Sequence, residues 1–197
     1  MHTPLVILDR DGTINQDSDD YIKSPEEWVA LPGAIDAIAK LNHAGWRVVI
    51  ASNQSGLGRG LFDVATLNLM HDKMNKALSK AGGRVDAIFY CPHTPDDNCT
   101  CRKPLPGLFE QIGERFGADL REVHAVGDSL RDAQAAAACG CIPHLVLTGK
   151  GEQFAGQALP DSFPPQTQMH STLAAFADWL LLQSMLKQSL STSHKSH

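Results

Sequence analysis

Five short, mostly apolar runs alternate with longer amphipathic stretches along this chain. The runs are residues 5–8, 47–51, 87–90, 123–126 and 144–147, and each is too short to be a helix. Continuous apolar runs of this length are typical of parallel strands that are covered on both faces. Strands that alternate with helices predict an α/β fold, namely a Rossmann-like, doubly wound, mainly parallel sheet in three layers.

The stretches between these runs have the apolar spacing of amphipathic helices. Helices are predicted over residues 32–45, 63–82, 106–117, 130–139 and 171–187, with a loop over residues 149–170. A chain of 197 residues favours a single domain. We place this domain at residues 1–187, followed by a polar, flexible C-terminal tail at residues 188–197.

The overall composition excludes several classes of protein. The net charge is -5, whereas binding to nucleic acid needs clustered positive charge. No apolar run approaches the roughly 18 residues of a transmembrane helix. The five cysteines are an odd number and are clustered, unlike those of a secreted disulfide framework. We therefore expect a cytoplasmic protein with free thiols and with no nucleic-acid or membrane partner.

Parallel sheets of this kind bind ligands at the carboxyl ends of their strands, so the residues after each strand are the first candidates for a site. Asp9, Arg10 and Asp11 follow the first strand, and two carboxylates spaced in this way can point to the same side. One carboxylate can attack phosphorus while the other transfers protons. Both can bind Mg2+, which prefers oxygen ligands. The alternative is a common Asp–Gly turn that leaves the strand.

Polar residues also follow the second and fourth strands. Ser52, Asn53, Gln54 and Ser55 offer hydroxyl and amide groups to a phosphate oxygen, although a plain polar turn has the same composition. Asp128 follows the fourth strand, where it can either bind a metal or cap the next helix.

A cluster of soft metal ligands follows the third strand. Its members, which lie within eleven residues, are Cys91, His93, Cys99 and Cys101. Three thiols and one imidazole are the ligands of a closed structural zinc site, and thiolates favour zinc over Mg2+. We therefore expect a zinc loop over residues 91–104, in which the metal shapes the loop and takes no part in catalysis. Lys103 of this loop can neutralise a phosphate, or it is a solvated surface charge.

Taken together, these segments resemble the haloacid dehalogenase superfamily of phosphatases, whose four motifs appear in order at four strand ends. The matching segments are Asp9-Arg-Asp11-Gly-Thr13, Ser52-Asn53, Lys103, and Gly127-Asp128-Ser129 with Asp132. The joint match is far more specific than any single motif.

A narrower resemblance, over about residues 4–151, is to the D-glycero-D-manno-heptose 1,7-bisphosphate 7-phosphatases. The segments that carry it are Asp9-Arg10-Asp11-Gly-Thr-Ile-Asn15, Ser52-Asn-Gln-Ser-Gly56, Cys91-Pro-His93, Cys101-Arg-Lys-Pro104 and Thr148-Gly-Lys150. Members of this group have no cap domain and carry a structural zinc loop. They remove the 7-phosphate during synthesis of heptose precursors for lipopolysaccharide or surface glycans. The alternative is the related histidinol-phosphate phosphatases of histidine biosynthesis, which share nearly the same motifs.

The resemblance implies a role for each matched residue. Asp9 is the expected nucleophile, which forms an aspartyl phosphate, and Asp11 is the expected general acid and base. The carboxylates of Asp9 and Asp128 and the main-chain carbonyl of Asp11 are expected to hold Mg2+. The three cysteines and the histidine named above are expected to hold zinc. Residues expected to bind phosphate or the rest of the substrate are Arg10, Asp17, Asp19, Asp20, Ser52, Asn53, Gln54, Ser55, Arg102 and Lys103.

The loops favour a sugar bisphosphate over histidinol phosphate. Arg102, Arg59 and Lys23 are expected to bind a second phosphate, since an arginine fork binds two oxygens at once. The acidic segment 17–20 is expected to accept hydrogen bonds from sugar hydroxyls, although it can also attract the amine of histidinol phosphate. We expect a monomer whose partner is a small sugar phosphate.

Two other classes of protein share part of the pattern. A receiver-like binding domain also has acidic strand ends and a lysine, but it needs no second acid of the kind that Asp11 provides. A zinc-stabilised interaction protein would bind zinc without turnover and would leave Asp9 and Asp128 unexplained. Release of phosphate from a sugar phosphate distinguishes the enzyme from both.

Overall fold

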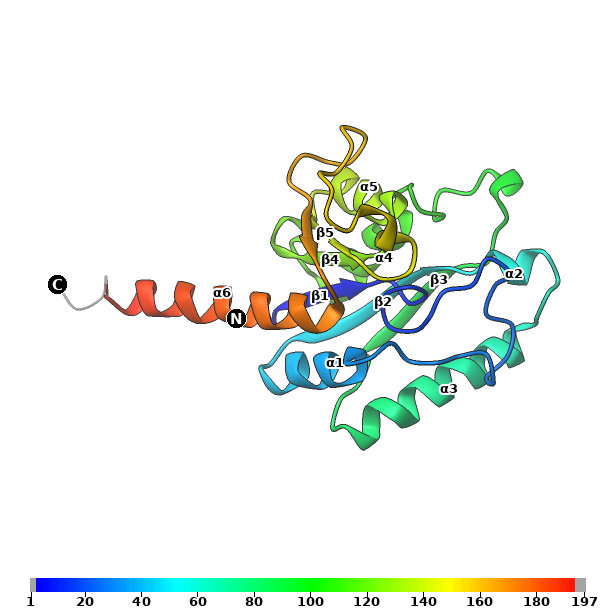
Figure 1. The fold of residues 1–197 in the computed structure, drawn as a ribbon, viewed down its shortest axis with the longest axis horizontal. Coiled ribbons are helices and arrows are strands. Elements are labelled where there is room, and N and C mark those ends of the chain that lie inside the picture. Colours follow the sequence, from blue (N-terminus) through cyan, green and yellow to red (C-terminus); the bar gives the residue numbers. More distant parts are fainter. Residues whose placement is uncertain (1–2, 194–197) are drawn as a thin grey trace.

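A six-stranded sheet forms the centre of the molecule (Figure 1). The computed structural model describes residues 3–193. Its strands are β1 (Leu5–Leu8), β2 (Arg47–Asn53), β3 (Ala87–Cys91), β4 (His124–Gly127), β5 (Ile142–Val146) and β6 (Gln168–His170). The strand order is β3-β2-β1-β4-β5-β6, and all neighbours are parallel. The predicted parallel α/β fold is confirmed.

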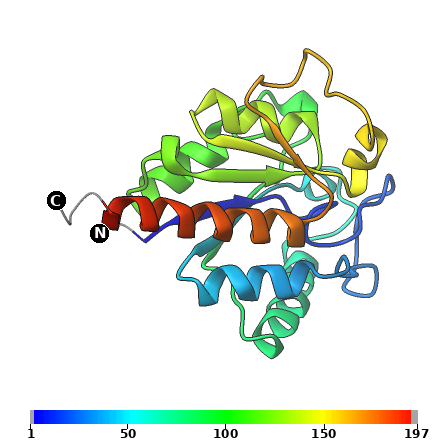
Figure 2. The same ribbon diagram turned by 60° about the vertical axis from the view of Figure 1, so that its left-hand side comes forward.

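Helices cover both faces of the sheet and complete the three layers (Figures 1 and 2). One face carries α1 (Ala34–His43), α3 (Val64–Lys80) and α6 (Leu173–Ser193), and the other carries α4 (Gly107–Phe116) and α5 (Leu130–Ala138). Short turns are α2 (Ser55–Gly58) and the 3-10 helices η1 (Pro95–Asp97), η2 (Leu120–Glu122) and η3 (Gly149–Phe154). No separate cap domain is evident among residues 3–193.

Strand β1 shows why the apolar runs are continuous. All of its side chains are buried. Val6 and Leu8 belong to the core beneath α1, α3 and α6, whereas Leu5 and Ile7 belong to the core beneath α4 and α5. Because successive side chains of a strand point to opposite faces, a strand with helices on both sides needs an apolar residue at every position.

The local signals for helix ends are also present. The carboxylate of Asp63 accepts a hydrogen bond of 2.7 Å from the main-chain N–H of Thr66, which caps α3 as predicted. Helix α4 ends at Gly117, whose left-handed backbone (φ 58°) suits a residue without a side chain. Both helix ends therefore fall at residues that the sequence marks as helix boundaries.

The structure corrects two predictions near the C-terminus. Strand β6 lies in the segment predicted to be a loop, because three residues without an apolar run can still pair with β5 at the sheet edge. Helix α6 continues to Ser193, so residues 188–193 are not the predicted tail; no glycine or proline interrupts the helix. Residues 194–197 of that tail lie outside the described residues. None of the helices in residues 3–193 is long and apolar enough to span a membrane.

Candidate active site

A polar cavity of about 250 Å³ lies at the carboxyl ends of β1, β2 and β4. It brings together most of the predicted site residues. Those that line it are Asp9, Asp11, Asp17, Asp19, Ser52, Asn53, Gln54, Ser55, Arg102, Lys103 and Asp128. Residues that the role assignments above did not include also line it: Ser18, Tyr21, Ile22, Ser129, Arg131, Asp132 and Lys150.

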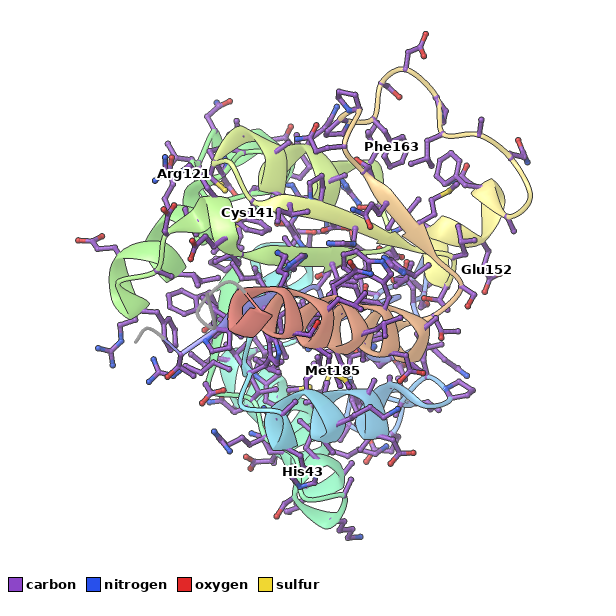
Figure 3. All side chains as sticks on the ribbon, turned by 90° about the vertical axis from the view of Figure 1, so that its left-hand side faces the viewer. His43, Arg121, Cys141, Glu152, Phe163 and Met185 are labelled. Atoms are coloured by element: carbon purple, nitrogen blue, oxygen red, sulfur yellow. The ribbon has the colours of Figure 1, made fainter. Side chains whose placement is uncertain are left out.

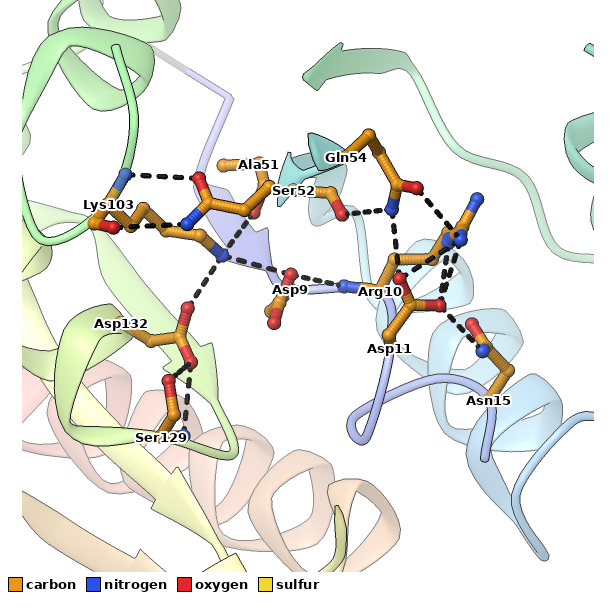
Figure 4. Close-up of polar contacts among 11 residues, drawn as sticks. Asp9, Arg10, Asp11, Asn15, Ala51, Ser52, Gln54, Lys103, Ser129 and Asp132 are labelled. Atoms are coloured by element: carbon orange, nitrogen blue, oxygen red, sulfur yellow. Dashed lines mark hydrogen bonds and ion pairs between the residues drawn. The ribbon is translucent and has the colours of Figure 1, made fainter. Parts of the chain in front are cut away.

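Lys103 is the buried cation at the base of this cavity (Figure 4). Its Nζ lies 2.9 Å from Oδ1 of Asp9 and 2.6 Å from Oδ1 of Asp132, and it donates a 2.7 Å hydrogen bond to the carbonyl of Ala51. The side-chain amide of Asn53 holds the main chain of Lys103 through two hydrogen bonds of 3.0 Å. Lys103 is therefore a positioned charge beside Asp9, not a solvated surface lysine.

The carboxylates of this cavity carry more negative charge than Lys103 can offset. Burial raises the pKa of Asp9 to about 7, with a further increase from Asp132 and Asp11 that Lys103 opposes. Burial together with the charges of Asp132 and Asp9 raises the pKa of Asp128 to about 8. One oxygen each of Asp9, Asp128 and Asp132 lie within 4.8 Å of one another. This hard, crowded oxygen set fits a divalent cation such as Mg2+.

A second loop fixes the position of Asp128. Its Oδ2 accepts a 2.8 Å hydrogen bond from the main-chain N–H of Lys150. The hydroxyl of Thr148 donates a 2.6 Å hydrogen bond to the carbonyl of Gly12, in the turn after β1. The Thr148-Gly149-Lys150 segment therefore joins the turn that follows Asp11 to the end of β4.

Asp11 is held by four side-chain hydrogen bonds from three neighbours (Figure 4). Arg10 donates two hydrogen bonds of 3.0 Å to its two oxygens. Asn15 donates a third at 2.8 Å, and Gln54 a fourth at 2.9 Å. Because Gln54 also donates to the hydroxyl of Ser52 at 2.8 Å, this network connects the ends of β1 and β2.

The side chain of Arg10, a residue predicted to bind phosphate or substrate, is not directed into the cavity. This side chain is fully buried and does not line the cavity. It contacts Asp11, lies 3.3 Å from Oε1 of Gln54, and has its NH1 3.4 Å from Nε2 of His71 on α3. Consecutive side chains of an extended segment point to opposite sides, so Arg10 is directed away when Asp9 faces the cavity.

Three other expected substrate contacts lie outside the cavity. Asp20 is exposed and does not line it, because the chain turns here through a 3.1 Å hydrogen bond from the N–H of Tyr21 to the carbonyl of Ser18. Lys23 does not line it either, and its Nζ donates to the carbonyl of Asp20 at 2.7 Å. Arg59 follows α2 and is exposed. The predicted substrate contacts of Asp20, Lys23 and Arg59 therefore stay predictions, and none of the three lines the cavity.

The four predicted zinc ligands lie close together at the end of β3. The Sγ of Cys91 lies 3.6 Å from that of Cys99 and 3.5 Å from Nδ1 of His93. The same Nδ1 lies 3.4 Å from Sγ of Cys101. A tetrahedron with zinc–sulfur bonds of about 2.3 Å has edges of about 3.8 Å, which these separations approach. The donor set and its spacing therefore fit a zinc ion.

Two residues of the cavity had a sequence signal that the role assignments did not use. Asp132 stands in the fourth motif, and its second oxygen also accepts hydrogen bonds from the N-cap residue Ser129. Lys150 stands in the Thr-Gly-Lys segment, and its Nζ lies 3.0 Å from Oδ2 of Asp17. The charged partner of each, Lys103 for Asp132 and Asp17 for Lys150, depends on contacts between distant loops, which the sequence does not reveal.

Comparison with known proteins places this arrangement in a family. The model of the haloacid dehalogenase-like hydrolases matches residues 6–140, which include Asp9, Lys103 and Asp128. The chain belongs to this hydrolase family. The resemblance of its four motifs to the haloacid dehalogenase superfamily is therefore confirmed.

Within this hydrolase family, close relatives share one name. A curated protein from Bordetella bronchiseptica, D-glycero-beta-D-manno-heptose-1,7-bisphosphate 7-phosphatase, is 59% identical over 90% of this chain and 97% of its own length. The protein of the same name from Pseudomonas aeruginosa is 51% identical over 92% of this chain and 99% of its own.

A solved structure extends this relationship to three dimensions. The crystal structure of D,D-heptose 1,7-bisphosphate phosphatase from B. bronchiseptica, complexed with magnesium and phosphate, has a TM-score of 0.87 to this hydrolase. It is 58% identical in sequence and covers 91% of this chain and 99% of that chain. The fold and its proportions are therefore those of a solved family member.

Proposed function

We propose that this hydrolase removes the 7-phosphate of D-glycero-D-manno-heptose 1,7-bisphosphate through an aspartyl-phosphate intermediate at Asp9. The observation that carries this proposal is the position of Asp9 in the cavity, 2.9 Å from Lys103 and grouped with Asp128 and Asp132. A carboxylate beside a fixed ammonium and a cation site can approach a phosphate dianion, which it would otherwise repel.

The proposed reaction has two steps. In the first, a carboxylate oxygen of Asp9 forms a bond to phosphorus while the bond from phosphorus to the sugar oxygen breaks, and Asp11 gives a proton to that oxygen. In the second, water attacks phosphorus and gives its proton to Asp11, and the acyl phosphate bond breaks to release phosphate and free Asp9. The hydrogen bonds from Arg10, Asn15 and Gln54 orient Asp11 for both proton transfers.

Mg2+ and Zn2+ have different roles in this proposal. Asp9, Asp128 and the main-chain carbonyl of Asp11 would hold Mg2+, which neutralises charge on the transferring phosphate. The relative from B. bronchiseptica was crystallised with magnesium and phosphate, which supports this choice of metal. The zinc cluster is closed by four protein ligands, so its role is to shape residues 91–104, which carry Arg102 and Lys103. Ser52 and Lys103 would bind the transferring phosphate.

The choice of substrate rests mainly on the relatives. Their names specify the heptose bisphosphate, and their identity extends over nine-tenths of the chain. The cavity adds Arg102 for a second phosphate and the carboxylates of Asp17 and Asp19 for sugar hydroxyls. Histidinol phosphate has no second phosphate, so it would make fewer contacts with these residues.

We propose that the enzyme works as a monomer. Its substrate is a charged sugar phosphate that does not cross membranes unaided. We therefore propose a cytoplasmic role in the synthesis of heptose precursors for surface glycans. Light scattering at the exit of a sizing column tests the oligomeric state.

The nucleophile is tested with Asp9→Asn. This change keeps the shape of the side chain and removes the attacking charge, so we expect kcat for phosphate release to fall at least about a thousandfold. Asp36→Asn, at an exposed position of α1, is the matched control and should retain full activity. Near-normal turnover by a folded Asp9→Asn enzyme would exclude Asp9 as the nucleophile.

The substrate is tested by comparing kcat/KM for the heptose 1,7-bisphosphate and for histidinol phosphate in the presence of Mg2+. We expect a preference of at least about a hundredfold for the bisphosphate, because each charge-assisted contact to its second phosphate contributes to binding. A higher kcat/KM for histidinol phosphate would assign the enzyme to the alternative reaction.

A further inference from the structure

Two arginines line the active-site cavity without a carboxylate partner. Arg102 is half-buried in the zinc loop, and Arg131 is exposed on the first turn of α5. Both line the 250 Å³ cavity, and both also line a neighbouring hollow of about 350 Å³ beside the zinc loop. They therefore lie where the two spaces meet.

We propose that Arg131, acting together with Arg102, binds the phosphate that is not hydrolysed and so makes the enzyme selective for a bisphosphate. This inference rests on the proposed function, and it adds a residue that the motifs of the family did not assign. The arguments are the free charge of the two arginines, their place relative to Asp9, and the geometry of a guanidinium.

The other cations of the cavity are already paired. Lys103 lies between Asp9 and Asp132, and Lys150 lies 3.0 Å from Asp17. By contrast, neither Arg102 nor Arg131 takes part in an ion pair within residues 3–193. The side chain of Arg102 donates a hydrogen bond to the carbonyl of His93 at 3.3 Å. Both guanidiniums therefore keep donors for a ligand.

Arg102 and Arg131 are two like charges that line the same two spaces. Arg131 lies in the first turn of α5, two residues after the N-cap residue Ser129, where the helix dipole disfavours a cation. An anion that binds both guanidiniums would offset the repulsion between the two like charges and the unfavourable effect of the helix dipole on Arg131.

This anion cannot be the phosphate under attack. The reacting phosphate must contact Asp9, where Lys103 and the hydroxyl of Ser52 are available. Arg102 and Arg131 line both this cavity and the hollow beside the zinc loop, whereas Asp9 and Ser52 line the cavity but not the hollow. The arginine pair is therefore positioned for a second phosphate on the same substrate. Each planar guanidinium can bind two oxygens of that phosphate, which a lysine cannot do.

The test compares two substrates that share the reacting 7-phosphate, the heptose 1,7-bisphosphate and the heptose 7-phosphate, with the magnesium-loaded full chain. For Arg131→Ala we expect kcat/KM for the bisphosphate to fall about 10- to 100-fold, mainly through KM, and kcat/KM for the 7-phosphate to change less than about twofold. Arg131→Lys should restore only part of the loss. The matched control is Arg115→Ala, at an exposed position of α4 that lines none of the cavities described above.

Two results would overturn the inference while leaving the phosphatase function intact. One is an equal loss for both substrates, which would mean that Arg131 only supports the fold or the reacting phosphate. The other is an unchanged kcat/KM for the bisphosphate in Arg131→Ala. A wild-type enzyme that hydrolyses neither heptose phosphate would instead overturn the proposed function itself, and this inference with it.

Discussion

The carboxylate of Asp128 lies so close to the backbone of two loops that only glycine fits at the points of contact. A side chain added at Gly12 or at Gly149 would collide with the carboxylate of Asp128, and both glycines have a left-handed backbone, with φ of 80° and 54°. The turn after β1 and the loop after β5 therefore approach Asp128 more closely than any other residue type would permit. The precise position of this carboxylate depends on two glycines that carry no chemistry themselves.

This dependence predicts different outcomes at two glycines with the same backbone. Gly12→Ala should lower kcat at least about tenfold, because its methyl group must displace Asp128. Gly45→Ala has a φ of 88° but nothing within 4 Å of the added methyl group, so it should cost only about 1–2 kcal/mol of unfolding free energy and leave kcat unchanged. Urea unfolding and steady-state phosphate release measure both effects. Equal kcat in the two variants would contradict this account of Asp128.

Arg10 shows what a motif cannot reveal about one side chain. The sequence places it between two acidic residues of the site, which favours a substrate-binding role. The structure buries it against Asp11, Gln54 and His71. Burial is possible because the negative charge of Asp11 and the polar groups around it satisfy the guanidinium. Its partner on α3 is sixty-one residues away in the sequence, so no local pattern could have predicted the contact.

The segment 91–104 brings the four predicted zinc ligands close together. Its ligands stand close together in the chain, so their spacing alone indicated a cluster. What the sequence did not show is how the loop is tied to the sheet. Asn53 at the end of β2 holds the main chain of Lys103 through two hydrogen bonds, and Arg102 donates to the carbonyl of His93 inside the loop. Hydrogen bonds to β2 and within the loop therefore jointly position Lys103.

Loss of one zinc ligand should loosen this element. For Cys99→Ser we expect the bound zinc to fall from about one per chain to a small fraction, together with a lower kcat/KM, because the loop that presents Lys103 is no longer closed. Cys139→Ser is the matched control, since Cys139 lies at the end of α5 beside Cys141 and outside the cluster. Elemental analysis of both purified proteins measures the metal. Absence of zinc from the wild-type protein would refute the site.

At the scale of the whole molecule, one feature connects half of the sheet: a row of three histidines joins β4, β5 and β6 beneath α6. Nδ1 of His124 lies 2.9 Å from Nε2 of His144, and Nδ1 of His144 lies 3.0 Å from Nε2 of His170. The rings of Phe176 and Trp179 pack against all three imidazoles. Burial lowers the pKa of each histidine, that of His124 to about 4 and that of His144 to about 2.

These lowered pKa values predict a loss of stability in acid. Above pH 6.5 a histidine is neutral in both states and adds no pH dependence. Below pH 6.5 the unfolded chain takes up a proton that the folded protein excludes, so the free energy of unfolding falls by up to about 1.4 kcal/mol per pH unit for each such histidine. This loss continues as the pH falls toward the folded pKa.

The variant His144→Gln keeps a donor and an acceptor in the row but does not titrate. Relative to this variant, the wild-type protein should lose about 2 kcal/mol of unfolding free energy between pH 6.5 and pH 5. His43→Gln is the control, since His43 is exposed at the end of α1 (Figure 3) and should leave the pH dependence of the wild type unchanged. Urea unfolding at the two pH values supplies the comparison. Parallel pH profiles for wild type and His144→Gln would show that His144 is not buried in neutral form.

The amino-acid sequence by itself determined the class of fold, five of the six strands and the positions of Asp9, Lys103 and Asp128 at strand ends. These features are local, because burial on two faces and the ends of helices leave patterns within ten or twenty residues. Only the tertiary structure decided that β6 completes the sheet, that Arg10 turns away from the cavity, and that Arg131 lies beside Arg102. Each of these depends on which distant segments meet, and that is settled by packing of the whole chain, which no local pattern records.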